Sequence, residues 1–98
     1  MDIFYRSVKS GVVQGGTTAA QMPDVPCSRV NIKALTDNST NVYIGGANVT
    51  VPGAETNETG GFTLDAGQET GWLDIDNLNK LWMITNANGD DVSYLALV

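Results

Sequence analysis

The stretch LWMITNANGDDVSYLALV, Leu81 to Val98, contains two apolar runs on either side of Asn88-Gly89. Both runs are rich in valine, isoleucine and leucine, as is typical of strands. An Asn-Gly pair between such runs predicts a β-hairpin, because a type I′ turn needs positive φ at both central residues. The density of apolar residues further predicts two strands buried on both faces in the middle of a sandwich, the last at about Asp91 to Leu97.

Further strands are predicted upstream at close spacing. In RVNIKAL, Arg29 to Leu35, polar and apolar residues alternate, which indicates a half-buried strand. Shorter strands are predicted in NVYIGG, NVTV, FTL and WLDI, whereas DNLNK, residues 76–80, fits either a helical turn or a loop. No segment has apolar residues at helical spacing over three turns. The sequence therefore predicts an all-β fold, as a small β-sandwich or jelly-roll-like domain.

The first 26 residues differ in composition from the rest of the chain. After a strand predicted at about Ile3 to Lys9, the segment GVVQGGTTAAQMPDVP is rich in glycine, threonine, alanine and proline. We therefore expect an N-terminal extended arm at 1–26 and a β-sandwich domain at 27–98. An arm that clasps a neighbour would use its apolar side chains, and these are the expected partner-binding residues: Ile3, Phe4, Tyr5, Val8, Val12 and Val13.

The chain has 98 residues and a formal net charge of −6, with no histidine. Because no cluster of Lys and Arg could neutralise phosphates, we expect no direct nucleic-acid partner. No apolar run reaches the roughly 20 residues of a membrane-spanning helix, and no secretory signal is visible, so no membrane partner is expected. A single cysteine, Cys27, favours a reducing compartment, and hence assembly in the cytoplasm. Self-association would extend the thin core of so short a chain.

No group of residues predicts catalysis, a cofactor or a metal site. Cys27 and the hydroxyl residues have no histidine to act as their base. The segment DIDNLN lacks the glycine and the glutamate of a calcium loop, so we interpret Asp74, Asp76 and Asn77 as caps of a tight turn. The neighbours Asp90 and Asp91 are interpreted as solvated turn residues, unsuited to acid–base chemistry. We therefore do not expect an enzyme.

Two tryptophans are expected in different environments. Trp82 lies within a dense apolar run and is expected in the core, whereas Trp72 follows Gly71 and is the better candidate for exposure. An exposed Trp72 is a further expected partner-binding residue. It could anchor a protein interface or stack against a sugar.

Residues 27–98 resemble a family of small virion proteins of tailed bacteriophages. The resemblance lies in VNIKAL followed by a turn, then NVYIGGANVT, GGFTLDAGQE, LDIDNLNKLWMI and GDDVSYLAL, in that order. The β-sandwich members of this family are similar to capsid decoration (cement) proteins, which commonly sit as trimers on the outer shell. The resemblance implies a structural protein on the outer capsid surface of the virion, with itself, as a homotrimer, and the major capsid protein as partners. A tail, neck or head–tail component and a glycan-binding module of the virion are the alternatives.

Overall fold

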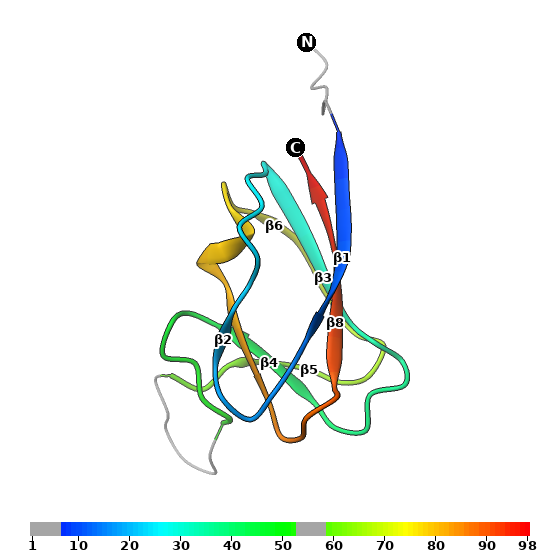
Figure 1. The fold of residues 1–98 in the computed structure, drawn as a ribbon, viewed down its shortest axis with the longest axis vertical. Coiled ribbons are helices and arrows are strands. Elements are labelled where there is room, and N and C mark those ends of the chain that lie inside the picture. Colours follow the sequence, from blue (N-terminus) through cyan, green and yellow to red (C-terminus); the bar gives the residue numbers. More distant parts are fainter. Residues whose placement is uncertain (1–6, 53–58) are drawn as a thin grey trace.

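The computed structural model describes residues 7–52 and 59–98, which form eight β-strands and one short 3-10 helix (Figure 1). The strands are β1 (Val8–Gln14), β2 (Ala20–Gln21), β3 (Arg29–Ala34), β4 (Val42–Gly45), β5 (Phe62–Leu64), β6 (Glu69–Asp74), β7 (Trp82–Thr85) and β8 (Asp91–Leu97). The helix, η1 (Leu78–Lys80), lies between β6 and β7. The prediction of an all-β fold is confirmed.

The strands form two four-stranded antiparallel sheets. Sheet A has the order β1-β8-β3-β6, and sheet B has the order β2-β7-β4-β5. The pairing is nested, because β1 pairs with β8, β2 with β7, β3 with β6, and β4 with β5. The pairs β3–β8 and β4–β7 then join these couples into the two sheets. The predicted β-sandwich is therefore confirmed.

The core lies between the two sheets and follows the alternation seen in the sequence. In β3, Val30, Ile32 and Ala34 are fully buried, while Arg29 and Lys33 are exposed on the other side. The other strands add alternating buried side chains, namely Val42, Ile44, Leu64, Met83, Val92 and Ala96. Because strand side chains point alternately to opposite faces, this one-sided burial leaves the outer face of each sheet open to solvent.

The ambiguous segment DNLNK forms η1. Leu78 points into the core and is fully buried. Asn77 caps the helix, because its side-chain Oδ1 accepts a hydrogen bond from the backbone N of Asn79 at 2.9 Å. The interpretation of Asn77 as a cap is confirmed.

The described part of the first 26 residues is packed into the sandwich, which differs from the expected arm. The strand expected at Ile3 to Lys9 is found at Val8–Gln14 within the described residues, and it pairs along its whole length with β8. Met22 and Val25 join the core cluster, because a thin core gains from each additional apolar side chain. The change in composition at Pro26 therefore does not coincide with a break in packing. The part of the expected arm that contains Ile3, Phe4 and Tyr5 lies outside the described residues.

The prediction of a β-hairpin at Asn88-Gly89 is wrong, because the strands on either side of this turn, β7 and β8, do not pair with each other. The segment does turn, and Gly89 has φ +92°, but no residue other than glycine has positive φ among those described, so the turn is not type I′. It leads from β7 in sheet B to β8 in sheet A. Each of these strands already has a neighbour on both sides, and therefore neither can pair with the other.

The two central strands are buried on one face rather than on both. Their burial alternates along the strand, and Trp82 is half-buried instead of lying fully in the core. The third strand expected at NVTV is reduced to a single bridge between Thr50 and Gly60. The sandwich has only two layers, and for this reason even its central strands keep one face toward solvent.

The last strand is expected to be essential for folding. A chain that lacks Leu95 to Val98 loses the buried Ala96 and the pairs that Leu97 makes with both Val8 and Arg29. We expect it to lose its cooperative thermal transition in calorimetry and near-UV circular dichroism. The point variant Leu95→Ala is the control, because this side chain lies on the outer face, and it should cost less than about 1 kcal/mol. A truncated chain that still melts cooperatively would contradict the placement of β8.

Candidate functional site

The outer face of sheet A carries most of the exposed large apolar side chains of the described residues. Outward positions line up across β1, β8, β3 and β6 in three rows: Val8, Leu97, Arg29 and Asp74; Ser10, Leu95, Asn31 and Trp72; Val12, Ser93, Lys33 and Glu69. Four of the five exposed large apolar residues lie in these rows, namely Val8 (58% exposed), Val12 (63%), Trp72 (45%) and Leu95 (39%). The fifth, Phe62, belongs to sheet B. We call these three rows the outer A face.

The outer A face brings together some of the residues expected from the sequence. Val8 and Val12 of β1 share it with Trp72 of β6, and the predicted exposure of Trp72 is confirmed. Val13 points the other way and packs against the core, because it lies opposite the fully buried Val92. Leu95 was missed, although the alternation within DVSYLALV places it on the side opposite to Val92 and could have identified it.

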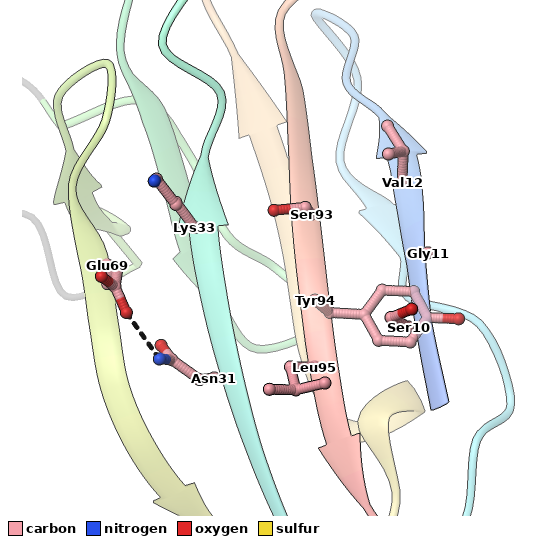
Figure 2. A pocket seen from close by; sticks show the side chains of 9 residues that line it. All are labelled: Ser10, Gly11, Val12, Asn31, Lys33, Glu69, Ser93, Tyr94 and Leu95. Atoms are coloured by element: carbon pink, nitrogen blue, oxygen red, sulfur yellow. Dashed lines mark hydrogen bonds between the residues drawn. The ribbon is translucent and has the colours of Figure 1, made fainter. Parts of the chain in front are cut away.

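A shallow depression of about 420 Å³ lies on the outer A face (Figure 2). Its walls carry both polar and apolar side chains, including Ser10, Val12, Asn31, Lys33, Glu69, Ser93 and Leu95. Asn31 Nδ2 donates to Glu69 Oε1 at 2.6 Å, while Asn31 Oδ1 is buried and has no hydrogen-bond partner among the described residues. At the margin of the face, Arg29 Nε lies 2.7 Å from Asp74 Oδ1. The depression can therefore bind through apolar contact and hydrogen bonds, and within the described residues no hydrogen bond joins its serines to Lys33 or Glu69.

Tyr94 fixes the conformation of β1 at the edge of this depression. Its ring reaches across to Gly11 (Figure 2), the residue directly opposite on β1. A Cβ atom at position 11 would lie 2.9 Å from Tyr94 Oη, so no larger residue fits while the ring keeps this position. An aromatic ring over a glycine of an edge strand covers backbone that would otherwise be open to water.

The carboxylate of Asp90, at the start of β8, is buried and holds the β3–β4 loop. This corrects the expectation that Asp90 is solvated. Asp90 is 3% exposed. Its Oδ1 accepts hydrogen bonds from Ser39 N at 2.9 Å and Ser39 Oγ at 3.2 Å, and its Oδ2 accepts from Thr40 N at 2.9 Å and from Thr40 Oγ1. These donors, led by the Thr40 hydroxyl, hold the pKa of Asp90 below its ordinary value. The carboxylate is therefore an ionised structural anchor rather than a proton donor or acceptor.

The backbone of Asp90 and Asp91 bonds to the same β3–β4 loop and also to the end of β1. Asn38 Nδ2 donates to the backbone O of Asp91 at 2.8 Å, and Asn38 Oδ1 accepts from Asp91 N at 2.9 Å. Gly15 N donates to Asp90 O at 2.9 Å, and a Cβ atom at position 15 would lie 2.3 Å from that oxygen. The β3–β4 loop and the end of β1 are thus both attached to the start of β8, and only glycine fits at position 15.

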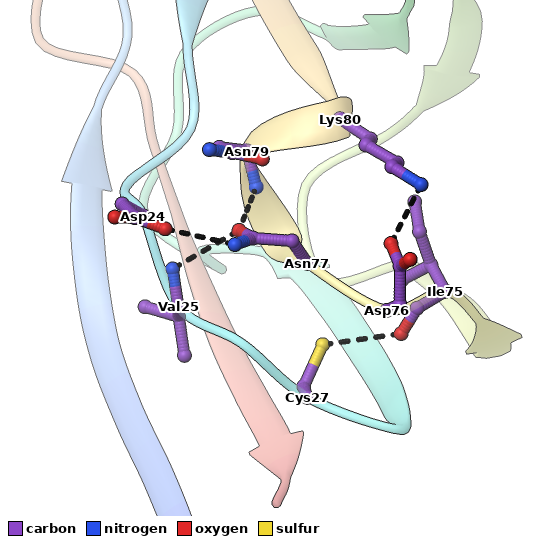
Figure 3. Close-up of polar contacts among 8 residues, drawn as sticks. All are labelled: Asp24, Val25, Cys27, Ile75, Asp76, Asn77, Asn79 and Lys80. Atoms are coloured by element: carbon purple, nitrogen blue, oxygen red, sulfur yellow. Dashed lines mark hydrogen bonds and ion pairs between the residues drawn. The ribbon is translucent and has the colours of Figure 1, made fainter.

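Cys27 is a packed thiol rather than a reactive one (Figure 3). It is half-buried, and its Sγ donates to the backbone O of Ile75 at 3.3 Å. Burial, with a further contribution from the nearby charge of Asp76, raises the pKa of Cys27. A raised thiol pKa lowers the fraction of nucleophilic thiolate, so this residue is unsuited to catalysis.

The segment around η1 is a hydrogen-bonded turn. Asn77 Nδ2 donates to Asp24 Oδ1 at 2.8 Å, and Asn77 Oδ1 accepts from Val25 N at 3.2 Å (Figure 3). Lys80 Nζ lies 2.7 Å from Asp76 Oδ1 and lowers the pKa of that carboxyl group. Within the described residues, no group of three or more His, Cys, Asp or Glu side chains could hold a metal ion.

No protein-family model matches the chain, and neither a curated protein nor a solved structure matches it. Within residues 7–52 and 59–98, no helix is long and apolar enough to cross a membrane. The resemblance to phage virion proteins therefore stays a hypothesis.

The buried Asp90 is expected to make stability depend on pH. Because its pKa is lowered in the folded state, the ionised group stabilises the fold above the unfolded-state pKa of about 3.9, and this contribution is lost as the pH falls through the lowered folded pKa. Asp90→Asn replaces one carboxylate oxygen with an amide N–H₂, which then faces two of the four donors. We expect it to lower the free energy of unfolding at pH 7 by roughly 2 kcal/mol. The difference from wild type should shrink below about pH 4.

Urea unfolding at pH 7, 5 and 3.5 measures this effect. Asp37→Asn is the matched control, because Asp37 is an exposed carboxylate in the loop that Asp90 holds. It should change stability little at any pH. A deficit of Asp90→Asn that stays the same from pH 7 to 3.5 would contradict the role of the ionised carboxylate.

Proposed function

We propose that the protein is a phage capsid decoration (cement) protein that stabilises the head by self-association and by binding to the shell of the major capsid protein. The observation that carries the proposal is the gathering of Val8, Val12, Trp72 and Leu95 on one sheet face. Soluble proteins rarely gather exposed apolar side chains on one face unless that face meets a partner. The same face offers no catalytic pair, so binding is the activity that it supports best.

The strand order supports the same proposal by analogy of fold. The nested pairs of β1 with β8 through β4 with β5 are those expected when one long antiparallel hairpin is rolled into two sheets, as in a jelly roll. Jelly rolls occur in viral capsid domains and in lectin domains. We therefore infer a jelly-roll domain.

The chemistry of the outer A face suits attachment to a larger shell. Its apolar side chains on β1, β8 and β6 surround the polar groups of the depression. Arg29 and Asp74 form an ion pair at its margin, so docking would bury apolar surface without leaving that charge unpaired. A protein that binds the assembled shell and not its dissociated subunits stabilises the shell by mass action. No covalent step or cofactor is needed for this role.

Shell binding is expected to depend on the apolar side chains of the outer A face. Purified protein should co-sediment with empty shells assembled from the major capsid protein of its phage, and it should raise their melting temperature. The double variant Trp72→Ser/Leu95→Ser should bind at least tenfold more weakly, because a few buried aromatic and apolar anchors dominate such interfaces. Both residues are exposed, so the variant should still fold.

The control is Phe62→Ser, which removes an even more exposed apolar side chain from sheet B. It should leave shell binding unchanged. Absence of co-sedimentation by the wild-type protein would overturn the decoration role. Electron microscopy of labelled virions distinguishes this role from that of a tail or neck component, which would be present in far fewer copies and away from the head.

Glycan binding is the second candidate function, favoured by the position of Trp72. This side chain lies across from Asn31, whose amide contacts Glu69 in the depression. An aromatic ring beside amide and carboxylate groups could stack a sugar ring and bind its hydroxyls. In a Trp82→Phe background, a bound glycan should change the fluorescence of Trp72. A glycan array without any signal would remove this candidate.

A further inference from the structure

β1 is an edge strand whose outer side is open. It ends the order β1-β8-β3-β6, and no strand within residues 7–52 and 59–98 pairs with its other side (Figure 1). It is seven residues long, contains no proline, and carries one charge, on Lys9. Natural proteins usually protect such an edge with several charges, proline, a bulge or a covering segment, because it can pair with another strand.

The hydrogen-bonding direction of each β1 residue follows from the bonds at its two ends. Ser7 O accepts from Val98 N at 2.9 Å, and Gly15 N donates to Asp90 O at 2.9 Å. Both contacts continue the register in which Val8 lies opposite Leu97 and Gln14 opposite Asp91. Bonded and non-bonded pairs alternate along an antiparallel ladder, so odd-numbered residues bond to β8. The even-numbered residues therefore direct their backbone N–H and C=O groups to the open side, namely Val8, Ser10, Val12 and Gln14.

We propose that a second copy of this chain occupies this edge, with the two β1 strands antiparallel about a twofold axis between their Ser10 residues. The inference rests on the self-association in the proposed function and adds the surface and the geometry. In this register Ser10 faces Ser10, and Val8 of each copy faces Val12 of the other. The even-numbered residues of the two strands then exchange backbone hydrogen bonds, as in β-strand addition.

Charge and side-chain pairing favour this register. Lys9 lies opposite Gly11 of the second copy, so the two Lys9 charges do not face each other, and like charges directly opposite are unfavourable. Val8 and Val12, both well exposed in the single chain, form two cross-strand apolar pairs. The contact uses the same edge in both copies, and therefore it closes at two rather than growing into a fibre.

Pairing at the edge would enlarge the outer A face instead of covering it. The side chains of Val8, Ser10 and Val12 stand on that face, while the hydrogen bonds form within the plane of the sheet. Sheet A of one copy would continue into sheet A of the other, with the apolar rows on the same side. Two linked faces bind a repetitive surface more tightly than one, because the second contact is intramolecular. This twofold pair differs from the trimer that the family resemblance implies.

Sedimentation equilibrium of the full chain tests the pairing. The wild-type protein should form a concentration-dependent dimer. Ser10→Pro removes an outward N–H without touching the bonds to β8, so its dimer dissociation constant should rise at least tenfold while the variant still melts cooperatively. The control Leu95→Lys places a charge on the outer A face, on β8 rather than on the edge strand itself, and it should keep the dimer. The edge pairing would be overturned if the wild-type protein sedimented as a monomer. It would also be overturned if Leu95→Lys lost the dimer while Ser10→Pro kept it.

Cross-linking tests the register independently and does not depend on the folding of the proline variant. In a Cys27→Ala background, Ser10→Cys should form a disulfide-linked dimer with oxidised glutathione, because directly bonded pairs have Cα atoms about 5.5 Å apart, within disulfide reach. Ser93→Cys lies on the neighbouring strand of the same face and should not cross-link. Equal cross-linking at both positions would overturn the register. If the cross-linked dimer forms but does not bind capsid shells, only the proposed function is overturned. If the protein binds shells as a monomer, only the edge pairing is overturned.

Discussion

The fold depends on one strand that is hydrogen-bonded on both sides. β8 pairs with β1 over seven positions and with β3 over six, while Val92 and Ala96 point from it into the core. With both of its sides occupied, β8 cannot also pair with β7, and the chain must cross to the other sheet between them. The same arrangement places β1 at the edge of sheet A. The topology of the sandwich and its open edge therefore have a common cause.

A buried charge secures the end of the molecule where this crossing takes place. Asp90 accepts hydrogen bonds from the backbone and hydroxyl groups of Ser39 and Thr40, so its burial is compensated by four donors. A buried carboxylate without such partners would be strongly unfavourable. The β3–β4 loop, which links the two sheets, is thereby held to the start of β8. A thin apolar core is thus supplemented by a satisfied polar cluster, at the expense of tolerance to acid.

Sheet A offers two surfaces with different chemistry. Its outer face presents apolar side chains of β1, β8 and β6, which suit a broad contact with another protein. Its β1 edge presents backbone groups, which suit the addition of a strand. The two do not compete, because an added strand lies in the plane of the sheet and leaves the face open. A protein that pairs with itself and also attaches to a shell needs such a separation of surfaces.

Local patterns in the sequence were sufficient to predict the fold class, most strands and the exposure of Trp72, because alternation and turn residues act over a few positions. Val8 and Val12, predicted as partner-binding residues, lie exposed on the outer A face, whereas Val13, predicted with them, faces the core, and the exposed Leu95 was not predicted. The strand partners, the burial of Asp90 and the inclusion of Met22 and Val25 in the core were decided by the tertiary structure. The physical reason is that a strand specifies which of its faces is apolar, whereas its neighbours are chosen by residues far away in the chain that compete for the same backbone groups and the same core.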